Sequence, residues 1–106
     1  MIPIAHPQLG AAEKRLVAQV IDSGRLAQGP MVAKFEQQVA ELSKARHAIA
    51  VSNGTIALDL ALRVAGIKAG DEVITTPFTF VATANAILAQ GARPVFVDID
   101  PATFNI

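Results

Sequence analysis

The chain has 106 residues, 52% of them hydrophobic, and its nine basic and nine acidic residues leave no net charge. This balance offers no basic face for nucleic acid, and the lack of cysteine excludes a disulfide framework or thiolate metal site. An intracellular, cytoplasmic setting fits the lack of cysteine, and no apolar run is long enough to span a membrane. We therefore expect neither nucleic acid nor a membrane as a partner.

The first part of the chain predicts two helices. Apolar residues at helical spacing favour a helix over residues 8–22. Gly29 and Pro30 then precede a second helical pattern over residues 31–43, as a start signal should. We expect residues 1–45 to form an N-terminal helical segment.

The rest of the chain alternates between short apolar runs and helical patterns, which is typical of an α/β fold with a parallel sheet flanked by helices. The runs are apolar throughout, which predicts a sheet buried on both faces. We expect residues 46–106 to form the start of one α/β domain. The expected strands cover residues 47–51, 72–76 and 94–99, and the expected helices cover residues 55–65 and 80–90.

Small residues join the first expected strand to the helix after it. Ser52, Asn53, Gly54 and Thr55 stand at this junction, and no acidic residue follows in the first helical turn. A helix N-terminus presents unpaired N–H groups and the positive end of the helix dipole, so the junction is suited to a small phosphate. An ordinary helix cap from Ser52 or Asn53 explains the same residues. The residues alone leave both interpretations open.

Two aromatic residues follow the second expected strand, in a chain whose aromatic content is only 5%. Phe78 and Phe80 are two residues apart, so in an extended loop their side chains point in opposite directions. One of them is then free to stack on a flat ligand while the other packs on the core. The alternative, in which both belong to the core, is the more common situation for phenylalanine.

Acidic residues and histidines give no sign of a metal site. Asp98 and Asp100 end the third expected strand without a third ligand nearby, and Asp100 with Pro101 is typical of a turn. His6 and His47 have no partner at a catalytic or metal-binding spacing. We interpret these residues as structural.

Four segments together resemble a known family. They are SGRLAQGPMVAKFEQQVAEL, AVSNGTIALDLAL, GDEVITTPFTFVATANAI and GARPVFVDIDPATFNI, in this order and at these intervals. They closely resemble the start of the DegT/DnrJ/EryC1/StrS family of pyridoxal-phosphate (PLP) dependent enzymes, which are mostly sugar aminotransferases. The resemblance covers nearly the whole chain and implies the N-terminal part of the aspartate-aminotransferase-like large domain, without the rest of that domain or the C-terminal domain.

The resemblance implies roles for several residues. Ser52, Asn53, Gly54 and Thr55 match the loop that holds the cofactor phosphate, chiefly through the amides of Gly54 and Thr55 and the Thr55 hydroxyl. Phe80 matches the aromatic residue that stacks on the pyridine ring, which leaves Phe78 as the core residue.

Other consequences of the resemblance concern the edge of the active site and what the chain lacks. Gly29 and Pro30 match a motif that borders the active site. The Schiff-base lysine of the family lies beyond residue 106, and no lysine here stands in a matching motif. The 106 residues alone are therefore expected to be inactive, and unstable or prone to aggregate.

The function implied by the resemblance is amino-group transfer, from a donor such as glutamate to a keto-sugar nucleotide, by a homodimer in nucleotide-sugar biosynthesis. A dehydratase of the same family, in which another residue replaces the lysine, is one alternative. A non-catalytic module that binds PLP or phosphate, or an unrelated phosphate-binding α/β domain, is another.

Overall fold

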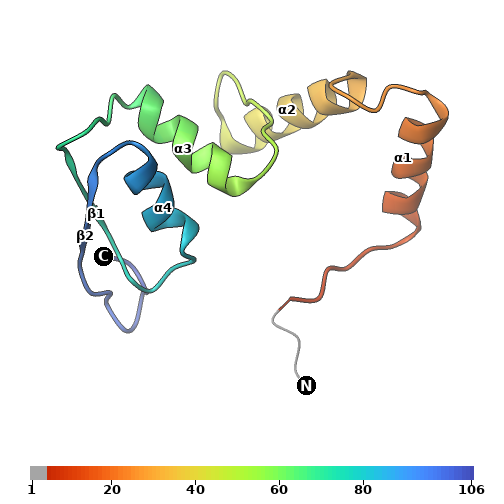
Figure 1. Ribbon diagram of the computed structural model, residues 1–106. Helices are drawn as coiled ribbons and strands as arrows, with labels where there is room; N and C mark the ends of the chain where they lie inside the picture. The colour runs from red at the N-terminus through yellow and green to blue at the C-terminus, as the bar shows by residue number, and fades with distance from the viewer. Residues whose placement is uncertain (1–4) are drawn as a thin grey trace. The chain divides into compact units, whose positions relative to one another are not determined.

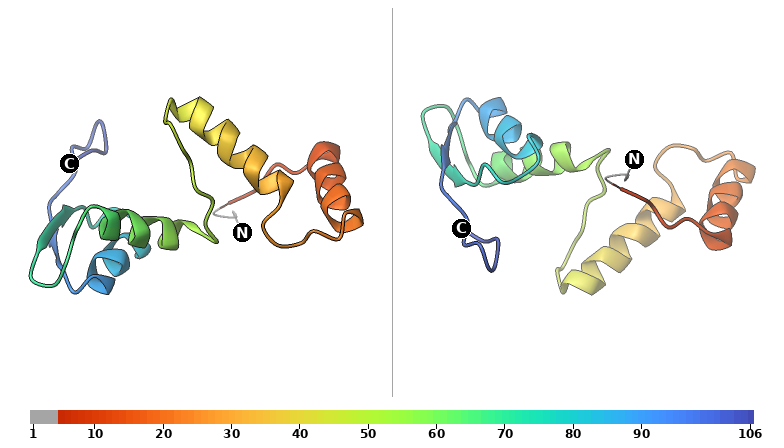
Figure 2. Two further views of the ribbon diagram at one scale, coloured as in Figure 1. Left: turned by 90° about the horizontal axis from the view of Figure 1, so that it is seen from above. Right: turned by 90° about the horizontal axis from the view of Figure 1, so that it is seen from below.

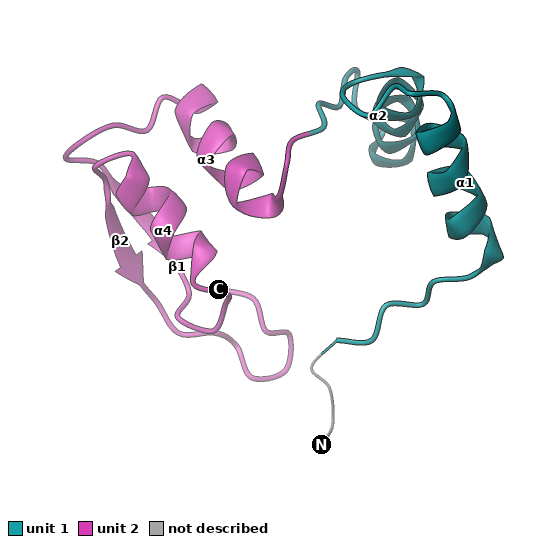
Figure 3. Cartoon of the chain, turned by 45° about the vertical axis from the view of Figure 1, so that its right-hand side comes forward, with its two compact units in different colours: residues 1–50 teal, residues 51–106 magenta. Residues whose placement is uncertain are grey.

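A computed structural model describes residues 5–106, which form four helices and two strands (Figure 1). The chain divides into two compact units, residues 1–50 and residues 51–106 (Figure 3). The elements are α1 (Ala11–Asp22), α2 (Pro30–Ser43), α3 (Gly54–Val64), β1 (Glu72–Thr75), α4 (Ala82–Ala89) and β2 (Arg93–Phe96).

Helix α1 begins three residues later than the sequence pattern predicts, because a local cap sets its start. Gly10 has an extended backbone, and its N–H donates to the Glu13 carboxylate at 2.6 Å. This contact satisfies one of the donors that a helix N-terminus leaves without a partner. The helix ends at Asp22, as predicted.

Helix α2 follows the start signal in the sequence. Gly29 precedes the helix with an extended backbone, and Pro30 occupies the first helical position, where a missing N–H costs nothing. The helix ends at Ser43, and Lys44 then adopts a left-handed conformation with φ of +54°.

The strand predicted over residues 47–51 is wrong for the described part of the chain. This segment has no hydrogen-bonded neighbouring strand within residues 5–106. The Ala50 N–H instead donates to the Glu36 carboxylate of α2 at 2.8 Å. Apolar composition predicts an extended backbone, but a strand also needs a paired neighbour, which local sequence cannot supply.

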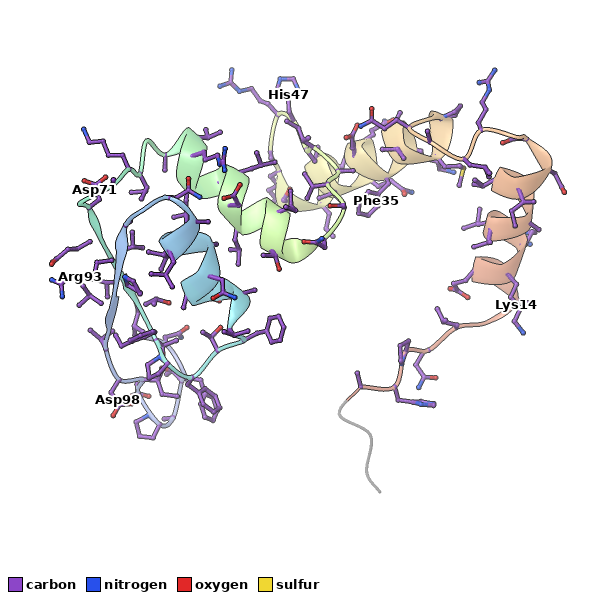
Figure 4. The ribbon with its side chains drawn as sticks, in the orientation of Figure 1. Lys14, Phe35, His47, Asp71, Arg93 and Asp98 are labelled. Carbon is purple, nitrogen blue, oxygen red and sulfur yellow. The ribbon has the colours of Figure 1, made fainter. Side chains whose placement is uncertain are left out.

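In the first unit the apolar faces of the helices are not buried. Neither α1 nor α2 has a buried residue, and Phe35 (labelled in Figure 4) and Leu42 are 55% and 86% exposed. The expectation that the chain is unstable alone stays a prediction, although such faces favour it.

The second unit contains the parallel strand pair that the alternating pattern predicts. β1 and β2 pair in parallel, with Glu72 opposite Arg93 and Thr75 opposite Phe96. Glu72 and Arg93 also form an ion pair. The Arg93 N–H donates to the Asp71 carbonyl at 2.8 Å, and Figure 4 labels both residues where the strands begin.

Helix α4 is the central element of this unit. It contacts both strands and also packs against α3, and the views in Figure 2 show α3 and α4 side by side. The Gln90 side chain donates to the Asp59 carboxylate of α3 at 2.5 Å, which ties the two helices together. The buried residues of the described chain all lie here: Thr75, Ala82, Ala86, Ile87 and Ala92.

Three predicted features of the second unit differ in the structure. Strand β2 ends at Phe96 instead of residue 99, because β1 ends at Thr75 and pairs no further. The sheet is not buried on both faces, because Ile74 and Phe96 are 61% and 52% exposed and α4 is the helix that packs on the strands. Helix α4 begins at Ala82 instead of residue 80, because the chain bends over residues 77–79 and Val81 forms the cap.

Gly91 provides a test of this packing. Its φ is +72°, and an added Cβ would lie 3.1 Å from the Ala69 Cβ. Gly66 follows α3 as Gly91 follows α4, with φ of +82° but no atom of residues 5–106 within 4 Å of its Cβ position. We expect Gly66→Ala to lower the free energy of unfolding by about 1 kcal/mol, and Gly91→Ala by roughly twice that, because only Gly91 adds a clash. Urea denaturation of the full-length protein followed by circular dichroism checks this, and equal losses would contradict it.

Candidate functional site

The junction before α3 contains a helix cap. Asn53 has an extended backbone, and its side-chain oxygen accepts a hydrogen bond from the Ile56 N–H at 3.0 Å. The Asn53 carbonyl accepts from the Ala57 N–H at 3.1 Å. Of the two capping residues proposed from the sequence, Asn53 is the cap.

The cap leaves two backbone donors free. Within residues 5–106, the N–H groups of Gly54 and Thr55 donate no hydrogen bond, because the first turn of a helix has no intrahelical acceptor for them. Asn53 satisfies Ile56 only. A cap and an anion site are therefore compatible at this junction, and the cap orders the turn that presents the free donors.

Open space lies beside Gly54. A Cβ built on Gly54 meets no atom within 4 Å, so no protein contact in the second unit requires a glycine there. A bare backbone also allows a ligand to approach the helix end closely.

This space is part of a pocket of about 680 Å³. Its volume lies in the range of small-molecule sites, about 300–1,000 Å³. No charged side chain lines it, and α3 has no acidic residue in its first turn, so the positive end of the helix dipole is not neutralised there. The lining residues are Asn53, Gly54, Thr55, Ala57, Leu58, Phe80, Ala82 and Thr83.

The sequence prediction thus named four residues that the structure brings to one pocket, namely Asn53, Gly54, Thr55 and Phe80. It missed the contribution of α4. Ala82 and Thr83 belong to the first turn of α4, so two helix N-termini line the same pocket. Their closeness in sequence to Phe80 was the available signal.

Phe80 lies in the loop that follows the carboxyl end of β1. Its side chain is 76% exposed, and its carbonyl accepts the Thr83 N–H at 3.0 Å. The hydroxyls of Thr79 and Thr83 also share a hydrogen bond at 3.1 Å. The loop is thereby attached to α4, with the Phe80 ring at the pocket.

The assignment of Phe78 to the core is wrong. Its side chain is 68% exposed, and its ring stacks on Phe104 with centroids 5.9 Å apart and planes 23° from parallel. Phe78 and Phe80 do point in different directions, as their spacing predicts. However, Phe78 packs on the ring of Phe104 in the turn after β2, and not on the core.

The carboxylates of Asp98 and Asp100 accept hydrogen bonds from nearby backbone amides, so both residues have the structural role that the sequence suggests. Asp98, labelled in Figure 4, accepts the Ile99 N–H at 2.9 Å. One carboxylate oxygen of Asp100 accepts the N–H groups of Thr103 at 2.7 Å and Ala102 at 2.9 Å. These bonds stabilise the charged form and lower the pKa of Asp100, the Thr103 amide most strongly.

The other residues named from the sequence do not line this pocket. Gly29 and Pro30 belong to the first unit, where they line a pocket of about 540 Å³ with residues of α1 and the following loop. His6 and His47 are exposed. Within residues 5–106 no three His, Asp or Glu side chains gather as metal ligands, and no helix is both long and apolar enough to cross a membrane.

The N-termini of α3 and α4 meet at one pocket with the loop that follows β1, and helix N-termini at the carboxyl ends of strands are where α/β proteins commonly bind anions. The chain belongs to the DegT/DnrJ/EryC1/StrS aminotransferase family, whose model matches residues 7–106.

Individual relatives agree with this membership. The chain is 49% identical over 105 residues to the spore coat polysaccharide biosynthesis protein SpsC of Bacillus subtilis, covering 99% of this chain and 27% of that protein. It is 46% identical over 101 residues to GDP-perosamine synthase of Vibrio cholerae, covering 94% of this chain and 28% of that one. The chain therefore spans little more than a quarter of the length of these relatives.

Solved structures share the fold. An aminotransferase from Psychrobacter cryohalolentis matches 95% of this chain with a TM-score of 0.86 and 41% identity, over 26% of its own length. The PLP form of Spr1654 from Streptococcus pneumoniae matches 97% with a TM-score of 0.88 and 34% identity, also over 26% of its length. The chain thus has the structure of part of an aminotransferase fold.

The cap at Asn53 gives a stability prediction. We expect Asn53→Ala to lower the free energy of unfolding by about 1 kcal/mol, because the Ile56 N–H loses its acceptor. Asn53→Asp keeps an acceptor oxygen and adds a charge that the α3 dipole favours, so it should unfold at the same or a higher urea concentration than the wild type. Denaturation curves of the two variants check this, and equal losses from both would contradict it.

The turn at Asp100 gives a pH prediction. Because the native pKa is lowered, the turn is fully stabilised above the pKa of the unfolded chain and loses this stabilisation as the pH falls through the native pKa. We expect the amide chemical shifts of Ala102 and Thr103 to change only below the ordinary aspartate range. Asp100→Asn, which accepts without titrating, should remove this dependence. A transition at or above the ordinary aspartate pKa would refute the assignment.

Proposed function

We propose that this chain is the N-terminal part of a PLP-dependent sugar aminotransferase, and that residues 46–106 begin the large, aspartate-aminotransferase-like domain. Family membership supports this proposal. The relatives are about four times as long as this chain, which matches only 27–28% of their length. Names of two relatives support the sugar substrate and the cofactor: GDP-perosamine synthase, and the PLP form of Spr1654. The proposed reaction moves an amino group from an amino acid, with glutamate as the expected donor, to a keto-sugar nucleotide.

The observation that carries this proposal is the pair of free N–H groups at the start of α3. We assign the PLP phosphate to the amides of Gly54 and Thr55 and to the Thr55 hydroxyl, with Asn53 ordering the turn. The uncharged pocket lining and the open space at Gly54 fit a dianionic group that approaches the backbone closely.

The ring of the cofactor is assigned to Phe80. Its side chain is largely exposed at the same pocket, so a face is available for a flat heteroaromatic ring. Such stacking contributes about 0.5–1.5 kcal/mol beyond the burial of surface. The phosphate donors at Gly54 and Thr55 and the ring of Phe80 would then hold the cofactor at two points.

The role of this chain in the reaction is binding and orientation. When bound, PLP supplies the electron sink for amino-group chemistry. The lysine that would join it covalently is proposed to lie beyond residue 106. Gly29 and Pro30 are proposed to border the substrate side of the site, and the active form is proposed to be a cytoplasmic homodimer.

A charge placed at the cap tests the phosphate assignment. In the full-length protein, Asn53→Asp should raise the Kd for PLP by about one order of magnitude, because its carboxylate repels the phosphate while the cap is kept. Phe80→Leu should raise the Kd by roughly two- to tenfold through loss of stacking. Equilibrium dialysis with absorbance detection measures both.

The control is Gln38→Glu, an equal change of charge at an exposed position of α2. It should leave the Kd for PLP unchanged. Wild-type affinity in Asn53→Asp would exclude the phosphate assignment, and the absence of any PLP binding by the wild type would exclude the proposed function.

A further inference from the structure

The loop over residues 76–81 presents Phe80 to the pocket, and its C-terminal end is attached to α4. Thr79 and Phe80 hydrogen-bond to Thr83 of α4. Within the loop, the Phe78 N–H donates to the Thr76 hydroxyl at 3.0 Å, which orders its first turn. The Phe80 ring itself is 76% exposed, so its position depends on the loop more than on contacts of its own.

A second attachment reaches the middle of the loop from a distant part of the chain. The Phe78 ring stacks on Phe104, which lies in the turn after β2. Neither ring lines the pocket of Gly54, Thr55 and Phe80. The stack is therefore a support for the loop and not a wall of the site.

The backbone around Phe104 is held in an unusual conformation. Its φ of +59° is rare for a bulky residue and persists only where the surroundings enforce it. Asp100 provides the enforcement: its carbonyl accepts the Phe104 N–H at 2.8 Å, and its N–H donates to the Asn105 carbonyl at 2.9 Å. Its carboxylate also binds the amides of Ala102 and Thr103.

We propose that Phe104 is a positioning residue, whose ring, aimed by the Asp100 turn, holds the loop over residues 76–81 so that Phe80 is preorganised for the cofactor ring. This inference rests on the proposed function, since it assumes PLP at the pocket. It assigns a task to a strained residue that touches neither the pocket nor the phosphate donors. Preorganisation of this kind increases affinity by reducing the ordering that binding requires.

Phe104→Gly separates the ring from the backbone, because glycine adopts the left-handed conformation without strain. Lys44→Gly is the matched control: Lys44 has φ of +54° but lies in the first unit, after α2. Phe104→Tyr keeps an aromatic ring and serves as the rescue variant. All are made in the full-length protein.

Two readouts are compared. Without added PLP, Phe104→Gly should increase amide hydrogen exchange over residues 76–81 several-fold. With PLP, it should raise the Kd by about two- to tenfold and reduce the circular dichroism of the bound cofactor, which reports ring orientation. Phe104→Tyr should restore both values, and Lys44→Gly should change neither.

Unchanged exchange in Phe104→Gly would overturn the positioning role whether or not PLP binds. Increased exchange with unchanged Kd and circular dichroism would also overturn it, because the loop would then move without consequence for the cofactor. Absence of PLP binding by the wild type would instead count against the proposed function, and the exchange comparison still decides whether Phe104 holds the loop.

Discussion

The hydrogen bond from the Ile56 N–H to the Asn53 side chain is the interaction on which the candidate site depends. It orders the first turn of α3 by satisfying one of that turn's donors, and it leaves the amides of Gly54 and Thr55 available at an uncharged pocket. A negative side chain in the same turn would neutralise the helix dipole. The sequence supplies none, and the positive end of α3 therefore remains available to a ligand.

Helix α4 and the loop before it complete the pocket from the other side. The contact of α4 with α3, reinforced between Gln90 and Asp59, brings two helix N-termini to the same space. The loop places Phe80 at this space, and the Phe78–Phe104 stack links the loop to the turn after β2. A site built from short-range caps is in this way connected to residues much later in the chain.

Local features and the strand–helix–strand order could be predicted from the sequence, and contacts with particular distant residues could not. The parallel pairing of β1 and β2 and the end of α1 at Asp22 follow from short apolar patterns and stop signals. The strand over residues 47–51 and the burial of Phe78 both needed neighbours that local sequence does not name. For the site, Asn53, Gly54, Thr55 and Phe80 meet at one pocket, while Thr83 was missed because its place depends on how α4 packs on α3.

The most direct measurement of the central claim is residue-specific. Addition of PLP to the isotope-labelled full-length protein, followed by NMR of the backbone amides, distinguishes donors that are free from donors already used. We predict large amide shift changes at Gly54 and Thr55 and small ones at Ile56, whose N–H already donates to Asn53. Unchanged Gly54 and Thr55 amides, or a change at Ile56 of equal size, would contradict the account.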